Sequence, residues 1–205
     1  MTRQRPLAID LDEHAVLVVV DMQRLFSAST SWHVPRLPGL VPLIADMIER
    51  RPAQTILTRF MTPASPEAAL GSWRRYYRRW SSVTLAEMDP GLLELVPELA
   101  GFAPPAEICD KTTYSAFESP GFVESLRRRA ARTLVFCGIE TDVCVLASVL
   151  GAIDHGYHVV LATDALASSS DAAHRAVLDL LVPRLDQQIA EVPVASILSG
   201  WTSSR

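Results

Sequence analysis

The chain has 205 residues, of which 49% are hydrophobic and 20% are charged, and this composition predicts one folded domain over residues 1–205 with a large buried core, not a disordered chain. Its formal net charge of -4 argues against nucleic acid or an anionic membrane as a partner. We find no signal-peptide pattern and no apolar run long enough to cross a bilayer, so a cytoplasmic protein is expected.

Short apolar runs alternate with longer amphipathic stretches along the chain. The first run, 15–21, is almost entirely apolar and ends in Asp21, which is typical of a strand buried in a parallel sheet. The alternation predicts an α/β fold in which helices cover both faces of a parallel sheet. The predicted strands are 15–21, 54–60, 106–110, 132–138, 157–165 and a weaker sixth at 187–193, and the predicted helices are 37–51, 119–130, 141–156 and 170–185.

The segment 60–105 interrupts this alternation. It is rich in proline and contains the sequence GSWRRYYRRW at 71–80. A connection of this length is predicted to pass over one end of the sheet and to contribute to a site or an interface. Trp73 and Trp80 fall on one helical stripe, and two interpretations stay open. The stripe packs inward under a solvated surface, or the cluster supplies a pocket wall, a subunit interface or an arginine for a substrate carboxylate.

Lys111 is the only lysine, since the other 18 of the 19 basic residues are arginine. Arginine replaces lysine easily on a solvated face, but it cannot replace a group that must share a proton, because guanidinium stays charged at any workable pH. A buried lysine shifts its pKa readily and suits proton chemistry. Lys111 is therefore a candidate catalytic residue, although a surface lysine acquired by drift is the simpler alternative.

Three reactive side chains are predicted near strand ends, namely Asp21, Lys111 and Cys144. The carboxyl ends of parallel strands form the edge of an open α/β sheet that binds ligands. A helix N-terminus and a nearby ammonium both favour a thiolate, and a nearby carboxylate can accept the thiol proton. The three residues are predicted to be base, electrostatic activator and nucleophile. Alternatively, the aspartate is a turn residue and the cysteine a packing residue.

The remaining cysteines and the histidines suggest neither disulfides nor metal sites. Three cysteines cannot all pair, and Cys109 and Cys137 are assigned to packing as reduced thiols within strands. The five histidines are scattered without a zinc-ligand spacing. We therefore predict no metal and no cofactor.

Three segments resemble the signatures of the isochorismatase-like cysteine hydrolases, a superfamily that includes nicotinamidases, N-carbamoylsarcosine amidohydrolase, biuret hydrolases and isochorismatases. They read VVVDMQRLF at 18–26, KTTYSAF at 111–117 and CGIETDVCVLASVLGAIDHGYHVVLATDA at 137–165. The resemblance extends from about residue 15 to 190. It implies a Rossmann-like three-layer α/β/α sandwich with a six-stranded parallel sheet, and a homodimer or homotetramer.

The resemblance also implies residue roles. Asp21, Lys111 and Cys144 match the family's general base, catalytic lysine and nucleophile. The bond between Ile139 and Glu140 matches a non-proline cis peptide, and the amides of Glu140 and Cys144 match the oxyanion hole. Residues expected near the substrate, from the resemblance or from the aromatic cluster, are Gln23, Phe26, Trp73, Trp80, Tyr114 and Phe117.

The sequence departs from relatives at several positions. Nicotinamidases in the family carry an Asp-x-His metal site after the second strand, whereas this segment reads LTRFMTPASP at 57–66 and has no histidine. Some isochorismatases, which cleave a vinyl ether by acid catalysis, lack the cysteine, so the presence of Cys144 favours a covalent thiol route. Arg24 and Leu25 stand where many relatives have Asn-Asp, which changes the pocket mouth or only a surface contact.

The predicted function is hydrolysis of an amide or related C–N bond of a small-molecule substrate through a thioester intermediate. Two other classes stay open. One is an isochorismatase-type hydrolase that cleaves a C–O bond of a vinyl ether or ester, in which arginines of 74–79 meet a substrate carboxylate. The other is a binding protein without activity on an inherited fold, against which the joint presence of the three reactive residues argues.

Overall fold

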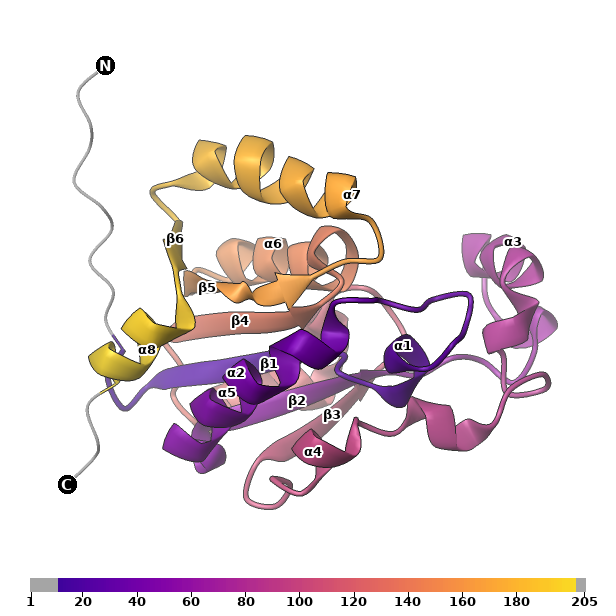
Figure 1. Ribbon diagram of the computed structural model, residues 1–205, viewed down its shortest axis with the longest axis horizontal. Coiled ribbons are helices and arrows are strands. Elements are labelled where there is room, and N and C mark those ends of the chain that lie inside the picture. The colour runs from indigo at the N-terminus through magenta and orange to yellow at the C-terminus, as the bar shows by residue number, and fades with distance from the viewer. Residues whose placement is uncertain (1–10, 202–205) are drawn as a thin grey trace.

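The computed structural model describes residues 11–201, so the ends of the predicted domain, 1–10 and 202–205, lie outside the described residues. Six strands form one sheet of order β3-β2-β1-β4-β5-β6, and every neighbouring pair is parallel (Figure 1). This confirms the predicted fold class, with strand ends shifted by at most two residues. The strands are β1 (Ala15–Val20), β2 (Thr55–Phe60), β3 (Glu107–Lys111), β4 (Thr133–Ile139), β5 (His158–Ala167) and β6 (Ile189–Val192).

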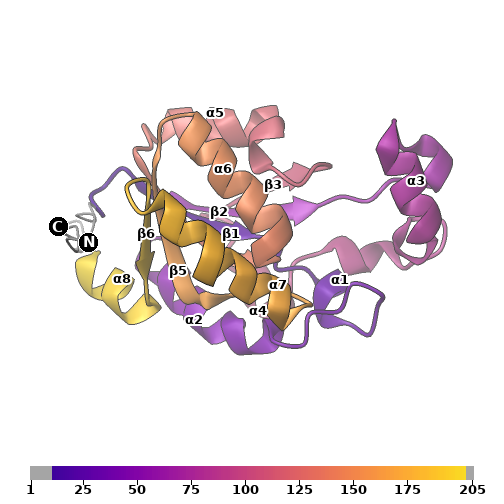
Figure 2. The ribbon, with the colours of Figure 1, turned by 90° about the horizontal axis from the view of Figure 1, so that it is seen from above.

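Helices cover both faces of the sheet, as the alternating pattern predicts. One face carries α2 (Leu37–Arg50), α4 (Pro97–Ala100) and α8 (Val194–Gly200), and α6 and α7 cover the opposite face (Figures 1 and 2). The sequence did not predict α1 (Arg24–Ser27), α4 or α8, each of which is short. The other helices are α3 (Ser72–Arg79), α5 (Pro120–Arg128), α6 (Leu146–Asp154) and α7 (Asp171–Ala176).

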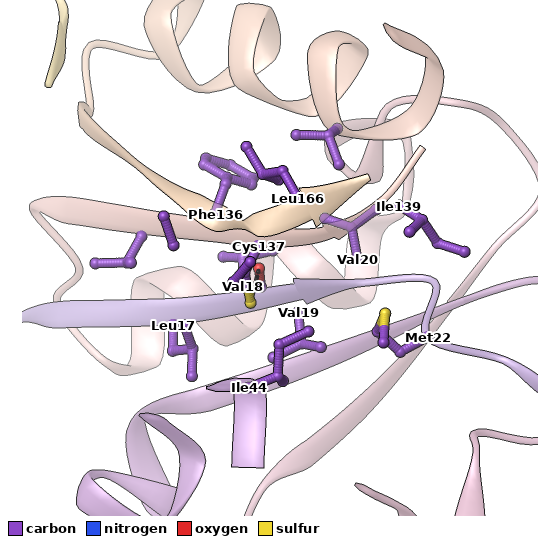
Figure 3. Packing of buried hydrophobic residues seen from close by; sticks show 14 of the residues in the cluster. Leu17, Val18, Val19, Val20, Met22, Ile44, Phe136, Cys137, Ile139 and Leu166 are labelled. Carbon is purple, nitrogen blue, oxygen red and sulfur yellow. Dashed lines mark hydrogen bonds between the residues drawn. The ribbon is translucent and has the colours of Figure 1, made fainter. Parts of the chain in front are cut away.

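The position of β1 in the centre of the sheet explains the almost entirely apolar run at 15–21. All six of its residues are fully buried, because it lies between β2 and β4 and is covered on both faces. Its side chains meet those of Phe136 on β4 and Ile44 on α2 in the core (Figure 3). A strand in this position has no solvated face, so apolar residues are favoured at every position.

The order of the strands reverses between β1 and β4. Successive strands run outward from β1 to β3 on one side and from β4 to β6 on the other. In such a sheet a crevice opens at the carboxyl ends of the two central strands. Asp21 follows β1 directly, and a π-helical turn, Thr141–Val145, follows β4 and leads into α6.

The long connection between β2 and β3 extends away from the sheet. It carries α3, which lies beyond the carboxyl ends of the strands at one extremity of the molecule (Figure 2). This agrees with the predicted excursion over one end of the sheet. None of the helices within residues 11–201 is both long enough and apolar enough to span a membrane.

Candidate active site

Asp21 and Lys111 form a buried ion pair at the carboxyl edge of the sheet. Lys111 Nζ lies 2.7 Å from Asp21 Oδ2, and the two side chains are 1% and 0% exposed. Asp21 leaves β1 with a φ of 51°, in the left-handed region that non-glycine residues rarely adopt and that is common at functional sites. A buried pair without water needs additional hydrogen bonds to satisfy its remaining polar atoms.

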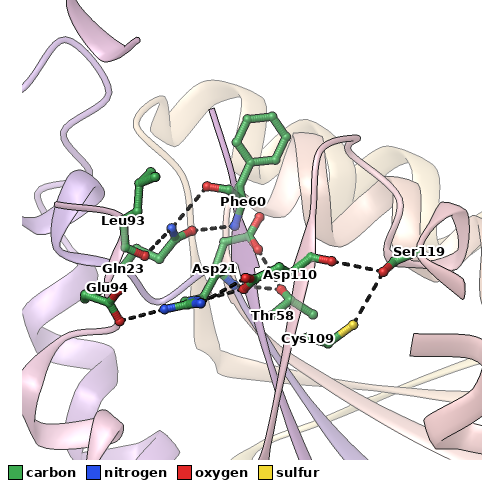
Figure 4. Close-up of polar contacts among 10 residues, drawn as sticks. Asp21, Gln23, Thr58, Phe60, Leu93, Glu94, Cys109, Asp110 and Ser119 are labelled. Atoms are coloured by element: carbon green, nitrogen blue, oxygen red, sulfur yellow. Dashed lines mark hydrogen bonds and ion pairs between the residues drawn. The ribbon is translucent and has the colours of Figure 1, made fainter. Parts of the chain in front are cut away.

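Thr58 supplies one such bond from the middle of β2, the strand between β1 and β3. Its hydroxyl donates to Asp21 Oδ1 at 2.6 Å, and the Thr58 hydroxyl oxygen accepts the Asp21 backbone N–H at 3.1 Å (Figure 4). Thr58 thus fixes the carboxylate that Lys111 neutralises. The sequence did not single out Thr58, which is one of two buried threonines in β2.

The environment of Lys111 keeps it charged. Burial by itself lowers the pKa of the Lys111 ammonium, but the Asp21 carboxylate raises it, as does Cys144 when it is ionised, and the net pKa lies above the ordinary lysine value. Its Nζ also donates to the Thr113 carbonyl at 3.2 Å and lies 4.8 Å from the centre of the Phe60 ring. The lone lysine is therefore a fixed cation in the interior.

Cys144 lies in the π-helical turn after β4 and is 7% exposed. Burial raises the pKa of its thiol, the Asp21 carboxylate raises it further, and the Lys111 ammonium lowers it, with a balance well above the ordinary cysteine value. Lys111 thus lowers the thiol pKa as expected, but burial and the Asp21 carboxylate outweigh its effect. The thiol is protonated at rest, next to a carboxylate that can take its proton.

The turn that carries Cys144 begins at a cis peptide bond between Ile139 and Glu140. The N–H groups of Val143 and Val145 both donate to the Glu140 carbonyl at 3.1 Å, which closes the turn around that residue. Glu140 and Cys144, the two residues expected to supply oxyanion-hole amides, thus belong to one tight turn at the end of the central strand β4.

A cavity of about 180 Å³ opens onto Cys144. Of the residues expected near a substrate, Phe26, Trp80 and Tyr114 line it. Six of its lining residues are aromatic, which makes its walls mainly apolar and planar. The remaining lining residues besides Cys144, none of them assigned to substrate binding from the sequence, are Ser31, Trp32, Phe60, Tyr76, Glu140, Val143 and Ser169.

The model of the family described as Isochorismatase domain matches residues 15–192. The chain belongs to the isochorismatase family. It is 27% identical to Nicotinamidase 3 of Arabidopsis thaliana over 80% of this chain and 78% of that protein. It is also 27% identical to the ureidoacrylate amidohydrolase RutB of Azorhizobium caulinodans over 80% of each. A cysteine hydrolase structure from Pseudomonas syringae pv. phaseolicola 1448A superposes with a TM-score of 0.79 at 22% identity, covering 97% of this chain and 98% of the other.

Gln23 does not line the cavity of this isochorismatase-family hydrolase. Its Nε2 donates to the carbonyls of Phe60 at 3.1 Å and Leu93 at 2.7 Å, and its Oε1 accepts the Phe60 N–H at 2.7 Å (Figure 4). The amide is fully buried and engaged at both ends by backbone. Its substrate role is therefore corrected to a structural one, in which Gln23 joins the end of β2 to the returning connection.

Phe117 and Trp73 also lie outside the cavity lining. Phe117 packs against Phe122 and His155, with ring centroids 5.1 and 4.9 Å apart, and so belongs to the packing of α5 and α6. Trp73 lies behind the pocket wall, 4.7 Å from the Tyr114 ring, and lines a neighbouring cavity of about 340 Å³. Both are corrected to supporting positions.

The arginines of 71–80 are not among the residues that line the cavity. Arg78 pairs with Glu67 at 3.5 Å on the surface, and the Arg79 guanidinium lies 5.3 Å from the centre of the Trp80 ring. Arg24 is exposed and donates to the Gly91 carbonyl at 3.3 Å, a surface contact.

A salt-bridge cluster lies at the end of β2, just before the segment expected from the sequence to carry a metal site in nicotinamidases. Arg59 pairs with Asp110 at 2.7 Å and with Glu94 at 2.6 Å. These contacts raise the already high pKa of Arg59, with the Asp110 hydrogen bond as the largest cause. Within residues 11–201, no three His, Cys, Asp or Glu side chains are grouped so that they could hold a metal ion.

Proposed function

We propose that this isochorismatase-family hydrolase is a cysteine amidohydrolase that cleaves a C–N bond of a small amide, ureide or carbamoyl compound. The observation that carries the proposal is the buried Asp21–Lys111 pair beside the Cys144 thiol at a small aromatic cavity. Two relatives whose names denote amide hydrolysis, Nicotinamidase 3 and a ureidoacrylate amidohydrolase, support this class over most of the chain.

In the first half-reaction Asp21 accepts the proton of the Cys144 thiol while the sulfur attacks the carbonyl carbon. The transfer must accompany the attack, because the pKa of the resting thiol is well above its ordinary value. The amides of Glu140 and Cys144 stabilise the tetrahedral oxyanion. When the C–N bond breaks, Asp21 returns the proton to the leaving nitrogen, and ammonia or an amine departs from a thioester.

In the second half-reaction Asp21 accepts a proton from a water molecule that attacks the thioester carbonyl. The C–S bond then breaks, the carboxylic acid is released and the proton returns to the Cys144 sulfur. Lys111 stays an ammonium throughout, and it stabilises whichever of the carboxylate and the thiolate carries the negative charge. One carboxylate thus serves as base and as acid in both halves.

The C–O alternative is less well supported by the cavity. A chorismate-derived acid carries carboxylates, which proteins bind with arginine or lysine. Among residues 11–201 no arginine lines the cavity, and Lys111 is already paired with Asp21. An acidic substrate would therefore enter without a partner for its charge.

The test is release of ammonia from a panel of small amides, ureides and carbamoyl compounds. We expect release by the wild-type enzyme and loss of nearly all turnover in Cys144→Ala, because residues that act as a unit fail together. Cys109→Ala is the matched control, since Cys109 lies on β3 outside the cavity lining. Wild-type turnover in Cys144→Ala on a confirmed substrate would show that the covalent mechanism is wrong.

A further inference from the structure

Glu140 is the one charged residue in the lining of the aromatic cavity. Its Oε1 accepts the Ser169 N–H at 3.3 Å, and it forms no ion pair with any cation of residues 11–201. Burial raises the pKa of Glu140 above its ordinary value, and the charge of Asp142 adds to the rise, although the contacts with Ser169 oppose it. Desolvation disfavours an unpaired, half-buried carboxylate, and a cationic ligand in the cavity would offset that cost.

A second acid on the same turn makes this side of the cavity more negative. Asp142 Oδ1 is buried and has no hydrogen-bond partner among the described residues. The nearby cations do not compensate for these two acids. Lys111 is neutralised by Asp21, and Arg79 is exposed and lies over the Trp80 ring outside the lining. Burial lowers the pKa of His174, which is hydrogen-bonded to Thr141, so it is neutral at pH 7.

Aromatic rings make up most of the remaining lining of the cavity. The Trp32 ring lies 6.0 Å from those of Phe26, Phe60 and Tyr76, and the Tyr114 ring is stacked 6.4 Å from that of Phe60. Aromatic faces attract cations through their quadrupole, most strongly where the cation has lost its water, and cages of such rings bind quaternary ammonium groups. Aromatic rings alone would also suit a neutral planar ligand. The Glu140 carboxylate is what favours a cationic ligand over a neutral one.

We propose, building on the amidohydrolase function, that this cavity selects small amides that carry a positively charged alkylammonium group, with Glu140 as the specificity-determining carboxylate. The aromatic rings enclose the alkyl substituents on nitrogen, Glu140 balances the charge, and the amide carbonyl faces Cys144. The cavity, at about 180 Å³, is smaller than sites for drug-sized ligands and suits a compact substrate.

Two amides of the same shape test the proposal. Betaine amide, (CH₃)₃N⁺–CH₂–CO–NH₂, and 3,3-dimethylbutanamide, (CH₃)₃C–CH₂–CO–NH₂, have the same shape and differ at one atom, which is a cationic nitrogen in the first and a neutral carbon in the second. We expect kcat/KM to favour the cation by about tenfold or more, as a desolvated cation–aromatic contact and an ion pair imply. Because the ammonium also makes the carbonyl more electrophilic, the deciding quantity is the change in this ratio on mutation.

Glu140→Gln removes the charge but keeps an oxygen that can accept the Ser169 N–H. It is expected to reduce the preference for the cation by about tenfold. Glu98→Gln, an exposed substitution on α4, is the matched control for net charge and should leave the preference unchanged. An unchanged ratio in Glu140→Gln would overturn the assignment.

A binding measurement separates this inference from the catalytic proposal. Calorimetric titration of Cys144→Ala with both amides reports on the cavity without turnover. Tighter binding of betaine amide that is lost in the Cys144→Ala/Glu140→Gln double variant supports the inference. It does so even if the wild-type enzyme releases ammonia from no compound of the panel, in which case the amidohydrolase proposal fails. The enzyme could instead cleave neutral amides through Cys144 and show no preference for the cation that depends on Glu140. That result would support the amidohydrolase proposal and overturn the inference.

Discussion

The carboxylate of Asp21 has two opposing effects on Cys144. Its negative charge raises the pKa of the thiol, yet the same carboxylate is the proposed acceptor of the thiol proton. Asp21 should therefore slow the reaction of the Cys144 sulfur with an external alkylating reagent while it promotes hydrolysis of an amide. Substitution of Asp21 can separate the two effects.

We predict that Asp21→Asn increases the rate of Cys144 alkylation by iodoacetamide at pH 7 while abolishing amide hydrolysis. Without the carboxylate, the Lys111 ammonium has only the thiolate as a counter-ion, so the pKa of Cys144 falls and more thiolate is present. Hydrolysis is lost because no base remains to receive and return the proton. The rate of alkylation is followed by mass spectrometry, with circular dichroism to verify folding.

A variant that removes the positive charge, in place of the negative one, is the control for this prediction. Lys111→Met removes the charge that lowers the pKa of Cys144, so its alkylation should slow. If Asp21→Asn and Lys111→Met change the alkylation rate in the same direction, the electrostatic account of the site is wrong.

The sequence singled out Asp21, Lys111 and Cys144, which the structure brings together, because each had a distinct signal. Lys111 was the sole lysine, and Asp21 and Cys144 adjoin central strands at the reversal of the sheet. Thr58 had no such signal, because threonine is common in strands for packing reasons alone. Gln23 was expected near the substrate because it follows Asp21 closely in sequence. Its side-chain amide instead donates to the backbone carbonyls of Phe60 and Leu93, which are distant in sequence and could not be foreseen.

The close approach of β4 to β1 depends on Gly138. It has a φ of 103°, and a Cβ at this position would lie 2.2 Å from the backbone oxygen of Val20. No side chain fits there without separating the two central strands. β1 leads directly to Asp21, and β4 leads directly to the turn that begins at Glu140. The same glycine therefore supports the sheet and the site.

We predict that Gly138→Ala destabilises the protein by about 3 kcal/mol or more, because strain in a left-handed conformation and a clash with backbone combine. Gly39→Ala in the first turn of α2 is the control, since a Cβ there meets nothing within 4 Å and a helix favours alanine over glycine by up to about 1 kcal/mol. Urea unfolding measures both. Equal stabilities of the two variants would contradict the role assigned to Gly138.

The sequence located the long elements more reliably than their irregularities. Continuous apolar runs determined the six strands, whereas the predicted helix 141–156 begins as a π-helical turn and the predicted helix 170–185 changes to π and 3-10 turns after Ala176. Pro183 lacks an amide proton, which accounts for part of the second irregularity. The first depends on contacts of the Glu140 carbonyl with two amides, which periodicity cannot reveal.

The stability of the whole molecule should depend on pH through Glu107, which joins the edge strand β3 to α5. Its carboxylate accepts hydrogen bonds from Ser125 at 2.8 Å, from Arg128 at 2.8 and 2.9 Å and from Arg129 at 2.8 Å. Burial raises the pKa of Glu107, but the bonds from Arg129, Ser125 and Arg128 lower it, and the net pKa lies below its ordinary value.

A carboxylate whose pKa is lower in the folded state stabilises the protein above its unfolded pKa, and the stabilisation is lost as the pH falls through the folded value. At pH 7 we therefore predict that Glu107→Gln lowers the free energy of unfolding by on the order of 1 kcal/mol, because the pair is partly solvated and screened. The difference from wild type should shrink as the pH falls below the ordinary glutamate pKa of about 4.3. Urea unfolding between pH 3 and pH 8 measures it, with Glu98→Gln as the exposed control. A difference that stays constant over this range would mean that Glu107 acts through packing, since only its charged form can account for a pH-dependent loss.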